Sequence, residues 1–186
     1  WIFRGFRSAV QENRPFDWPK VIGFAAEMYK ASPDPLHVAD CDDNSRSPEL
    51  RKSILNLFNE GIGSENGQIP ETMLSNVLDV LIRGMSDSDP SQDHELANMR
   101  RGRAVQLAIN CVRGIAFDAL YRFLFRIKSN DPLRESHWTR VRIALNEYMN
   151  QPQSHRLAVH AMLGQLFPLF WEIDREWIME CIDVVF

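Results

Sequence analysis

Side chains of the kind that bind metal ions gather in one short segment of the sequence, at His37, Asp40, Cys41, Asp42 and Asp43. Imidazole, thiolate and carboxylate groups are the usual metal ligands of proteins. However, the acidic run lacks the glycine and the closing glutamate of a calcium-binding loop. No second cluster of such ligands follows it along the chain. We therefore do not interpret this segment as a metal site.

The other residues with catalytic or ligand chemistry form no recognised pattern. His155 and His160 are five positions apart, about 140° around a helix, and cannot clamp one ion as an i, i+4 pair would. Cys41, Cys111 and Cys181 are spaced too widely for a disulfide framework or a zinc ribbon, and they suit a reducing cytoplasm. Nucleophile-elbow, P-loop and dinucleotide fingerprints are also missing. We expect no catalytic residue, metal or cofactor, and an enzyme would require a pocket that gathers titratable groups.

Arginines are the remaining candidates for a binding role. Residues 31–99 hold 13 acidic and 4 basic side chains, a net charge of −9, whereas residues 100–142 hold 10 basic and 3 acidic ones, a net charge of +7. A basic segment attracts phosphates, nucleic acid or an acidic protein. Arg100, Arg101 and Arg103 form the one tight cluster, so they are our candidate contacts to a partner or a phosphate. Mutual neutralisation of the two halves, or ordinary solvated stripes of arginine, is the structural alternative.

Helices must position these residues, because strand signals are nearly absent and apolar residues recur with a 3.6-residue period. Capping residues, prolines and glycines predict seven main helices and an eighth possible one near the N-terminus. The main helices are expected at 17–32, 47–60, 70–83, 103–128, 134–150 and 154–167, and from 174 onward. Pro168 should end or kink the sixth of them, and residues 86–95 should form an exposed, mobile acidic loop.

Residues 112–120, with the sequence VRGIAFDAL, resemble the second-helix motif of HEAT repeats. A related segment begins at Arg156, 43 residues after Arg113, within the period of about 40–47 residues of HEAT and armadillo repeats. The resemblance implies an all-α fold in which antiparallel helical pairs stack as a HEAT-like α-solenoid. An irregular helical bundle is the alternative. HEAT repeats usually carry an acidic residue six positions before the arginine, where this chain has Leu107 and Asn150, so the polar ladder of the family is in doubt.

The repeat divides the chain unevenly. Residues 100–186 are expected to hold the HEAT-like repeats, and residues 1–99 an aperiodic helical part with acidic loops, in one continuous structural unit. Arg113 lies near an apolar helix face, and a buried arginine needs a partner. We therefore interpret Arg113 and its equivalent Arg156 as structural residues that pair between repeats or bind helix-end carbonyls. A ligand contact is the alternative for Arg113.

A second resemblance concerns residues 104–186, through the segments AINCVRG at 108–114, AVHAMLG at 158–164 and IDREW at 173–177. They are similar to helical-repeat regions of large bacterial antiphage-defence proteins that carry a nucleotide-hydrolysing or sirtuin-like domain elsewhere. This resemblance implies a sensor or scaffold segment with catalysis outside the chain.

The bare ends at Trp1 and Phe186 favour a piece of a longer cytoplasmic protein, and no apolar run is long enough to enter a membrane. The leading hypothesis is thus a non-catalytic module that binds a protein partner or a neighbouring domain. The alternative is a nucleic-acid-binding helical repeat that uses the basic residues of 100–142.

Overall fold

The computed structural model describes residues 2–12, 14–15, 17–31, 46–63, 69–127, 134–150 and 157–185. Helices account for nearly all of this part, and the prediction of an all-α fold is confirmed. They are α1 (Ile2–Gln11), α2 (Trp18–Ala31), α3 (Arg46–Gly63), the 3-10 helix η2 (Glu71–Met73), α4 (Leu74–Met85), α5 (Gln92–Met99), α6 (Ala104–Ala108), α7 (Val112–Ile127), α8 (Arg134–Met149), α9 (Leu157–Ile173) and α10 (Arg175–Val185). None of these described helices combines the length and the apolarity needed to cross a lipid bilayer.

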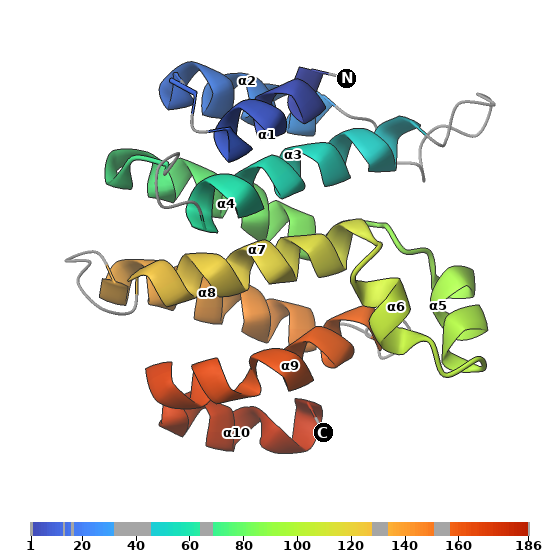
Figure 1. The fold of residues 1–186 in the computed structure, drawn as a ribbon. Coiled ribbons are helices and arrows are strands. Elements are labelled where there is room, and N and C mark those ends of the chain that lie inside the picture. Colours follow the sequence, from blue (N-terminus) through green and yellow to red (C-terminus); the bar gives the residue numbers. More distant parts are fainter. Residues whose placement is uncertain are drawn as a thin grey trace.

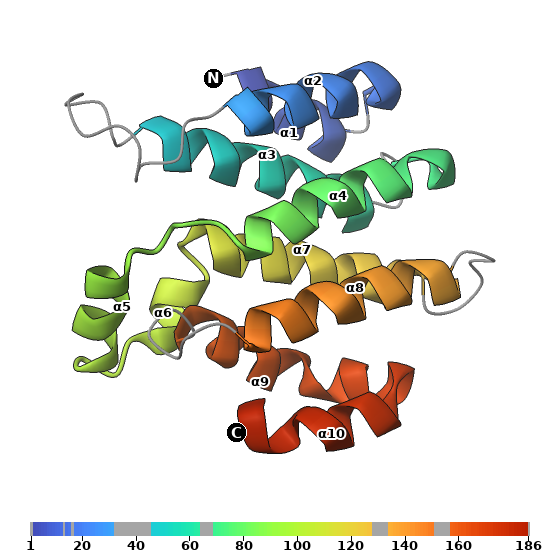
Figure 2. The same ribbon diagram turned by 180° about the vertical axis from the view of Figure 1, so that it is seen from behind.

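The eight longer helices form two layers (Figures 1 and 2). One layer contains α1, α3, α7 and α9 in that order, and each packs against the next. The other layer, seen from behind in Figure 2, contains α2, α4, α8 and α10, with α2 on α4 and α4 on α8. The short helices α5 and α6 lie outside the layers and project to one side, next to the start of α7.

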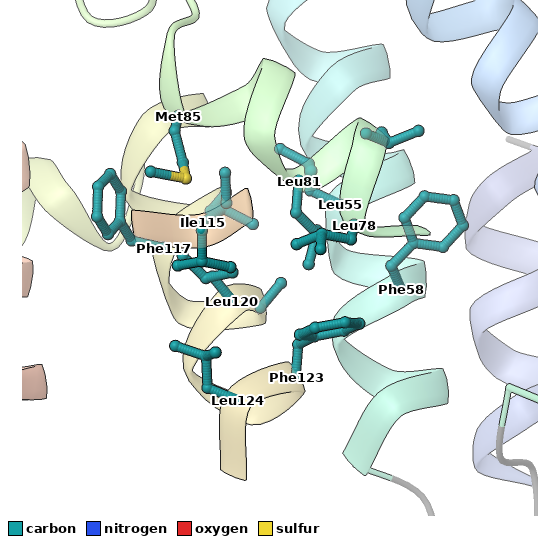
Figure 3. Packing of buried hydrophobic residues seen from close by; sticks show 14 of the residues in the cluster. Leu55, Phe58, Leu78, Leu81, Met85, Ile115, Phe117, Leu120, Phe123 and Leu124 are labelled. Atoms are coloured by element: carbon teal, nitrogen blue, oxygen red, sulfur yellow. The ribbon is translucent and has the colours of Figure 1, made fainter. Parts of the chain in front are cut away.

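The hydrophobic core runs through both layers without interruption. At its centre, side chains of α3 and α4 meet those of α7, as Figure 3 shows for Leu55, Leu78, Leu81, Leu120 and Phe123. All of these side chains are completely buried. Burying a leucine or phenylalanine contributes about 1.5–3 kcal/mol, so this contact joins the segments on either side of residue 100 firmly.

The helix expected over 103–128, in which Gly114 indicates close helix packing or a short break, is interrupted a few residues before this glycine. The chain turns at 109–111, which separates α6 from α7. Gly114 explains why the two pieces can pack so closely: a Cβ atom at this position would lie 1.7 Å from the carbonyl oxygen of Ala108. The glycine therefore permits the end of α6 to fold back onto the first turn of α7.

Two other expected helix ends also lie elsewhere. The helix with Gly84 continues to Met85, because this glycine serves packing: a Cβ atom there would lie 2.7 Å from that of Ala116 on α7. Of the two outcomes expected at Pro168, an end or a kink of the helix, the end does not occur, because α9 contains this proline and continues to Ile173. The helical proline costs one backbone hydrogen bond, while Leu169 and Phe170 beyond it remain buried.

Aromatic residues hold the last three helices together. The indole rings of Trp138 on α8 and Trp177 on α10 meet edge to face at 5.4 Å, and each lies about 6 Å from the ring of Phe170 on α9. Asp174 caps α10 by accepting a hydrogen bond from the backbone N–H of Trp177, and it also accepts one from the indole N–H of Trp138, both at 2.9 Å. Although burial raises the pKa of Asp174, these bonds and Arg142 outweigh it and lower the pKa.

Candidate functional site

Charged residues meet under the connection between α4 and α5, which comprises residues 86–91. The Nε atom of Arg51 on α3 lies 2.7 Å from a carboxylate oxygen of Asp87, and both side chains are buried. The hydroxyl group of Tyr29 on α2 donates a hydrogen bond to the same carboxylate at 3.1 Å. Burial raises the pKa of Asp87 above its ordinary value, and the bonds from the backbone N–H of Asp89, Arg51 and Tyr29 offset only part of this effect.

Asp89 and Glu95 continue this arrangement toward α7. Asp89 accepts a hydrogen bond at 2.8 Å from the backbone N–H of Val112, the first residue of α7, and therefore acts as an anion at the positive end of the helix. Arg113 is 3% exposed. It donates hydrogen bonds to the carbonyl oxygen of Pro90 at 2.5 Å and to the carboxylate of Glu95 at 3.0 Å.

These contacts correct the expectation for residues 86–95. The segment was predicted to be an exposed, mobile loop, but Asp87, Pro90 and Glu95 are held by protein groups, and residues from Gln92 onward form α5. Acidic residues of this segment can be buried because they pair with arginines of α3 and α7: Asp87 with Arg51, and Glu95 with Arg113. Arg113 is thus a buried, paired residue that joins α7 to the start of α5. Arg156, its equivalent in the sequence, lies outside the described residues.

Helices α5 and α6 and the turn between them form a projecting unit, residues 92–109, which we call the bracket (Figures 1 and 2). Its turn contains Arg100, Arg101 and Arg103, all exposed, which we call the basic tip. Gly102 has a φ angle of 63°, a conformation that glycine adopts readily at the end of a helix. The backbone N–H of Arg103 donates to the carbonyl oxygen of Asn98 at 2.9 Å, so the turn is closed by the chain itself.

Large apolar side chains are also exposed on the bracket. Within the described residues, nine large hydrophobic side chains are exposed, and the bracket holds four of them: Leu96, Met99, Val105 and Ile109. Other residues of the same two helices are buried, namely Glu95 on α5 and Leu107 and Ala108 on α6. Exposed apolar residues scattered singly are normal, whereas their concentration marks an interaction surface. These four residues were not predicted as a surface from the sequence, although Leu96 and Met99 at i, i+3 and Val105 and Ile109 at i, i+4 flank the arginines.

Other arginines of residues 100–142 are engaged with protein groups. Arg126 donates a hydrogen bond to the carbonyl oxygen of Ile69 at 2.6 Å. Arg140 pairs with Asp79, and Arg142 with Asp174. By contrast, no ion pair joins the basic tip to any residue that the structure describes. Among the described basic residues of the segment, the three arginines of the tip and the exposed Arg122 on α7 therefore remain without an ion pair.

Among the residues that the structure describes, two hollows lie beside α3 and α7. The first, of about 460 Å³, lies between α1, α3 and the turn before α7, and Arg7, Glu49, Lys52 and Ile109 help to line it. Its charges are paired, because Arg7 lies 2.6 Å from Glu60 and Lys52 lies 3.2 Å from Glu49. Neither that arrangement nor the lining supplies a nucleophile beside a base.

The second hollow, of about 550 Å³, lies between the end of α3 and the second half of α7. Tyr121, Arg122 and Phe125 contribute to its wall. Asp118, which also lines it, accepts a hydrogen bond from Asn59 at 2.6 Å. This hollow, like the first, brings together no acid, base and nucleophile in the described part of the chain.

Metal-ligating groups do not converge within the described residues, and His37, Asp40, Cys41, Asp42 and Asp43 lie outside them. Cys111 is buried at the turn between α6 and α7, where burial raises its pKa from 9.0 to about 11. A thiol with such a pKa is a poor nucleophile at neutral pH. Among the described residues, the bracket is the short segment in which three exposed arginines and four exposed large apolar side chains occur together.

Comparison with known proteins adds no relative: no family model matches the chain, and no match is found among curated proteins or solved structures.

Proposed function

We propose that this chain is a non-catalytic interaction module, a scaffold or sensor segment that contacts a protein partner or a neighbouring domain through the bracket. One observation carries the proposal: in a chain of net charge −4, the bracket combines an exposed basic tip with four exposed large apolar side chains. Protein interfaces combine apolar centres with arginine in this way. Cytoplasmic location and a role in antiphage defence stay predictions from the sequence.

The arrangement of the helices supports a HEAT-like α-solenoid within this proposal. Helices α7 and α9 are neighbours in one layer, with α8 between them in sequence. The positions aligned by the 43-residue repeat are buried in both helices: Ala116 with Val159, and Leu120 with Leu163. Equivalent burial is expected when each helical pair covers the apolar face of the next.

A nucleic-acid-binding role for residues 100–142 is the weaker candidate. Nucleic-acid binding rests on several arginines and lysines that can reach phosphates together. Arg113, Arg126, Arg140 and Arg142 instead bind groups of the protein. The basic tip remains, and its apolar neighbours favour a protein partner over a phosphate backbone.

Site-specific photo-crosslinking in cells that make the full-length polypeptide tests the proposal. A benzophenone amino acid replaces Met99 on the bracket or, as a matched control, Met179 on α10, which are 55% and 54% exposed. We expect discrete protein adducts at position 99, identified by mass spectrometry, and their absence at position 179. Adducts to nucleic acid at position 99 would support the weaker candidate, and equal adducts at both positions would contradict a specific surface.

A further inference from the structure

The bracket presents two short apolar ridges on either side of the basic tip. Leu96 and Met99 are three positions apart on α5, and Val105 on α6 is four positions before Ile109, the residue that follows this helix. Residues at these spacings share one face of a helix. Resting on the proposed function, we infer that the partner of this surface is an acidic amphipathic α-helix, whose apolar face lies on the ridges and whose carboxylates meet the basic tip.

Charge complementarity is the first argument for this partner. Arg100, Arg101 and Arg103 are exposed in a protein whose total charge is −4. Within the bracket, Glu95 is buried against Arg113, which leaves Asp93 as its one exposed acidic side chain. The tip is therefore a local positive field that steers acidic segments toward it, and guanidinium groups bind carboxylates with paired hydrogen bonds.

The apolar ridges favour an acidic protein helix over a nucleic acid, although both carry negative charge. A nucleic acid presents phosphates and bases, and single-stranded bases bind by stacking on aromatic rings. Residues 92–109 contain no phenylalanine, tyrosine or tryptophan, and aliphatic side chains contribute little to phosphate binding. The four exposed aliphatic residues instead offer an apolar surface on which an amphipathic helix can lay its own side chains at i, i+3, i+4 and i+7.

An anionic membrane fits the bracket less well than a helix does. Recognition of anionic lipids commonly uses clusters of about 4–8 lysines or arginines, whereas the tip has three arginines. Interfacial helices also place tryptophan or phenylalanine in the lipid, and the bracket has neither. Three arginines suffice, however, to bind the carboxylates along one or two turns of a partner helix.

The bracket is also held in place before any partner arrives. Arg113 fastens α5 through Glu95 and Pro90, and Gly114 allows α6 to lie against α7. The tip is closed by backbone hydrogen bonds from Gly102 to Met99 and from Arg103 to Asn98. A surface that is already ordered loses little conformational entropy on binding.

A displayed library of random 16-residue peptides, selected on the intact chain, tests the inference. The selection is repeated on the triple variant R100E/R101E/R103E, and peptides enriched on the unmodified chain alone are synthesised. We expect them to be acidic, with apolar residues at i, i+3 or i+4, and i+7. In fluorescence anisotropy their Kd should rise at least tenfold on the triple variant and fall when salt is lowered.

Matched variants distinguish binding at the bracket from non-specific electrostatic or hydrophobic binding elsewhere on the surface. The pair Met99→Gln and Val105→Gln should weaken peptide binding severalfold, whereas the pair Ile143→Gln and Met179→Gln, with similar exposure, should not. Glutamates in place of the exposed Lys20, Arg83 and Arg122 control for net charge. All these positions are exposed, and circular dichroism verifies that each variant folds.

Several results would overturn the inference. The first is that the enriched peptides lack acidic residues or helical spacing. The second is that no peptide depends on the basic tip for binding. The third is that poly(U) RNA or phosphatidylserine vesicles bind through the tip more tightly than any peptide does. If protein adducts form at position 99 while the acidic peptides fail, the interaction module stands and the acidic helix is excluded. If adducts fail as well, both are excluded.

Discussion

The acidic connection at residues 86–91 and the basic tip at residues 100–103 are close in the sequence and opposite in environment. The side chain of Asp87 is 6% exposed and pairs with Arg51, whereas all three arginines of the tip are exposed. Sequence composition marks both segments as polar. The difference teaches that burial of a charged segment depends on whether the fold places opposite charges beneath it.

The partners of the acidic connection come from distant parts of the chain. Arg51 and Lys52 lie on α3, and Arg113 lies on α7. Because these two helices pack side by side, their basic residues reach the connection together. A buried charge without such partners would cost several kcal/mol. The four predictions that follow probe this difference between the two segments.

The largest expected effect is on the buried pair of Arg113 and Glu95. Arg113→Ala should lower the free energy of unfolding by about 3–5 kcal/mol, because it removes the buried ion pair of Glu95 with Arg113 and leaves a buried carboxylate without that compensation. Urea unfolding followed by circular dichroism measures the change. Arg103→Ala on the tip is the control and should change the same quantity by less than about 0.5 kcal/mol.

The double variant Arg113→Met with Glu95→Leu distinguishes lost pairing from lost packing. Replacing a buried ion pair by apolar residues of similar volume is often nearly neutral, so the double variant should be more stable than Arg113→Ala alone. Equal loss in both variants would mean that the shape of Arg113, rather than its charge, holds the bracket.

The next largest effect is expected on the alkylation rate of Cys111, which is buried at the turn between α6 and α7. Burial raises the pKa of this thiol from 9.0 to about 11, which lowers the thiolate fraction at pH 8 about a hundredfold. Alkylation by iodoacetamide, followed at this residue by mass spectrometry, should be at least about a hundredfold slower in the native protein than in urea. Arg113→Ala should accelerate it if the pair closes this region. Rapid labelling of the unmodified protein would contradict the burial.

Tyr29 offers a smaller change on the other side of the acidic connection. Tyr29→Phe removes the hydrogen bond from the hydroxyl group to Asp87 and keeps the ring. We expect a loss of about 0.5–1.5 kcal/mol in the free energy of unfolding, measured by urea titration. Tyr121→Phe on α7, whose side chain is partly exposed, is the matched control and should cost less than Tyr29→Phe.

The smallest effect is expected at the basic tip itself. Replacement of Arg100, Arg101 and Arg103 by glutamine should leave the melting temperature within a few degrees, because exposed charges contribute little to stability. Differential scanning calorimetry measures it. Strong destabilisation by this triple variant would show that the tip is structural, and the contrast between the two segments would then fail.

Sequence reasoning succeeded where the physical cause is local. The 3.6-residue apolar period placed all seven main helices near their observed positions, because that period follows directly from helix geometry. It failed at residues 92–99 and 109–111. Helix α5 was missed since its one firmly buried residue, Glu95, is charged, and apolar periodicity cannot register it. A short break or close packing was expected at Gly114, but the break lies at 109–111, because Val105 and Ile109 read as core residues and are exposed.

For the candidate site too, the sequence predicted what depends on neighbouring residues, and the fold was needed for the rest. The sequence marked Arg100, Arg101 and Arg103 as candidates because they form the tight cluster in a segment of net charge +7; the structure shows that they are exposed, and their contact with a partner stays a prediction. Arg113 was expected to need a partner, but the identity of that partner as Glu95 required the fold. The apolar half of the bracket was not predicted at all, because exposure of an aliphatic residue depends on which neighbours cover it.

By itself, then, the sequence determined an all-α chain, the places where most helices start, and the position of its densest positive charge. These follow from backbone geometry, capping and covalent order, which act over a few residues. The tertiary structure alone decided that Asp87 and Glu95 are buried with arginines and that α5 and α6 project with apolar side chains exposed. The reason is that burial is a property of contacts between α3, α4 and α7, which no short window of sequence contains.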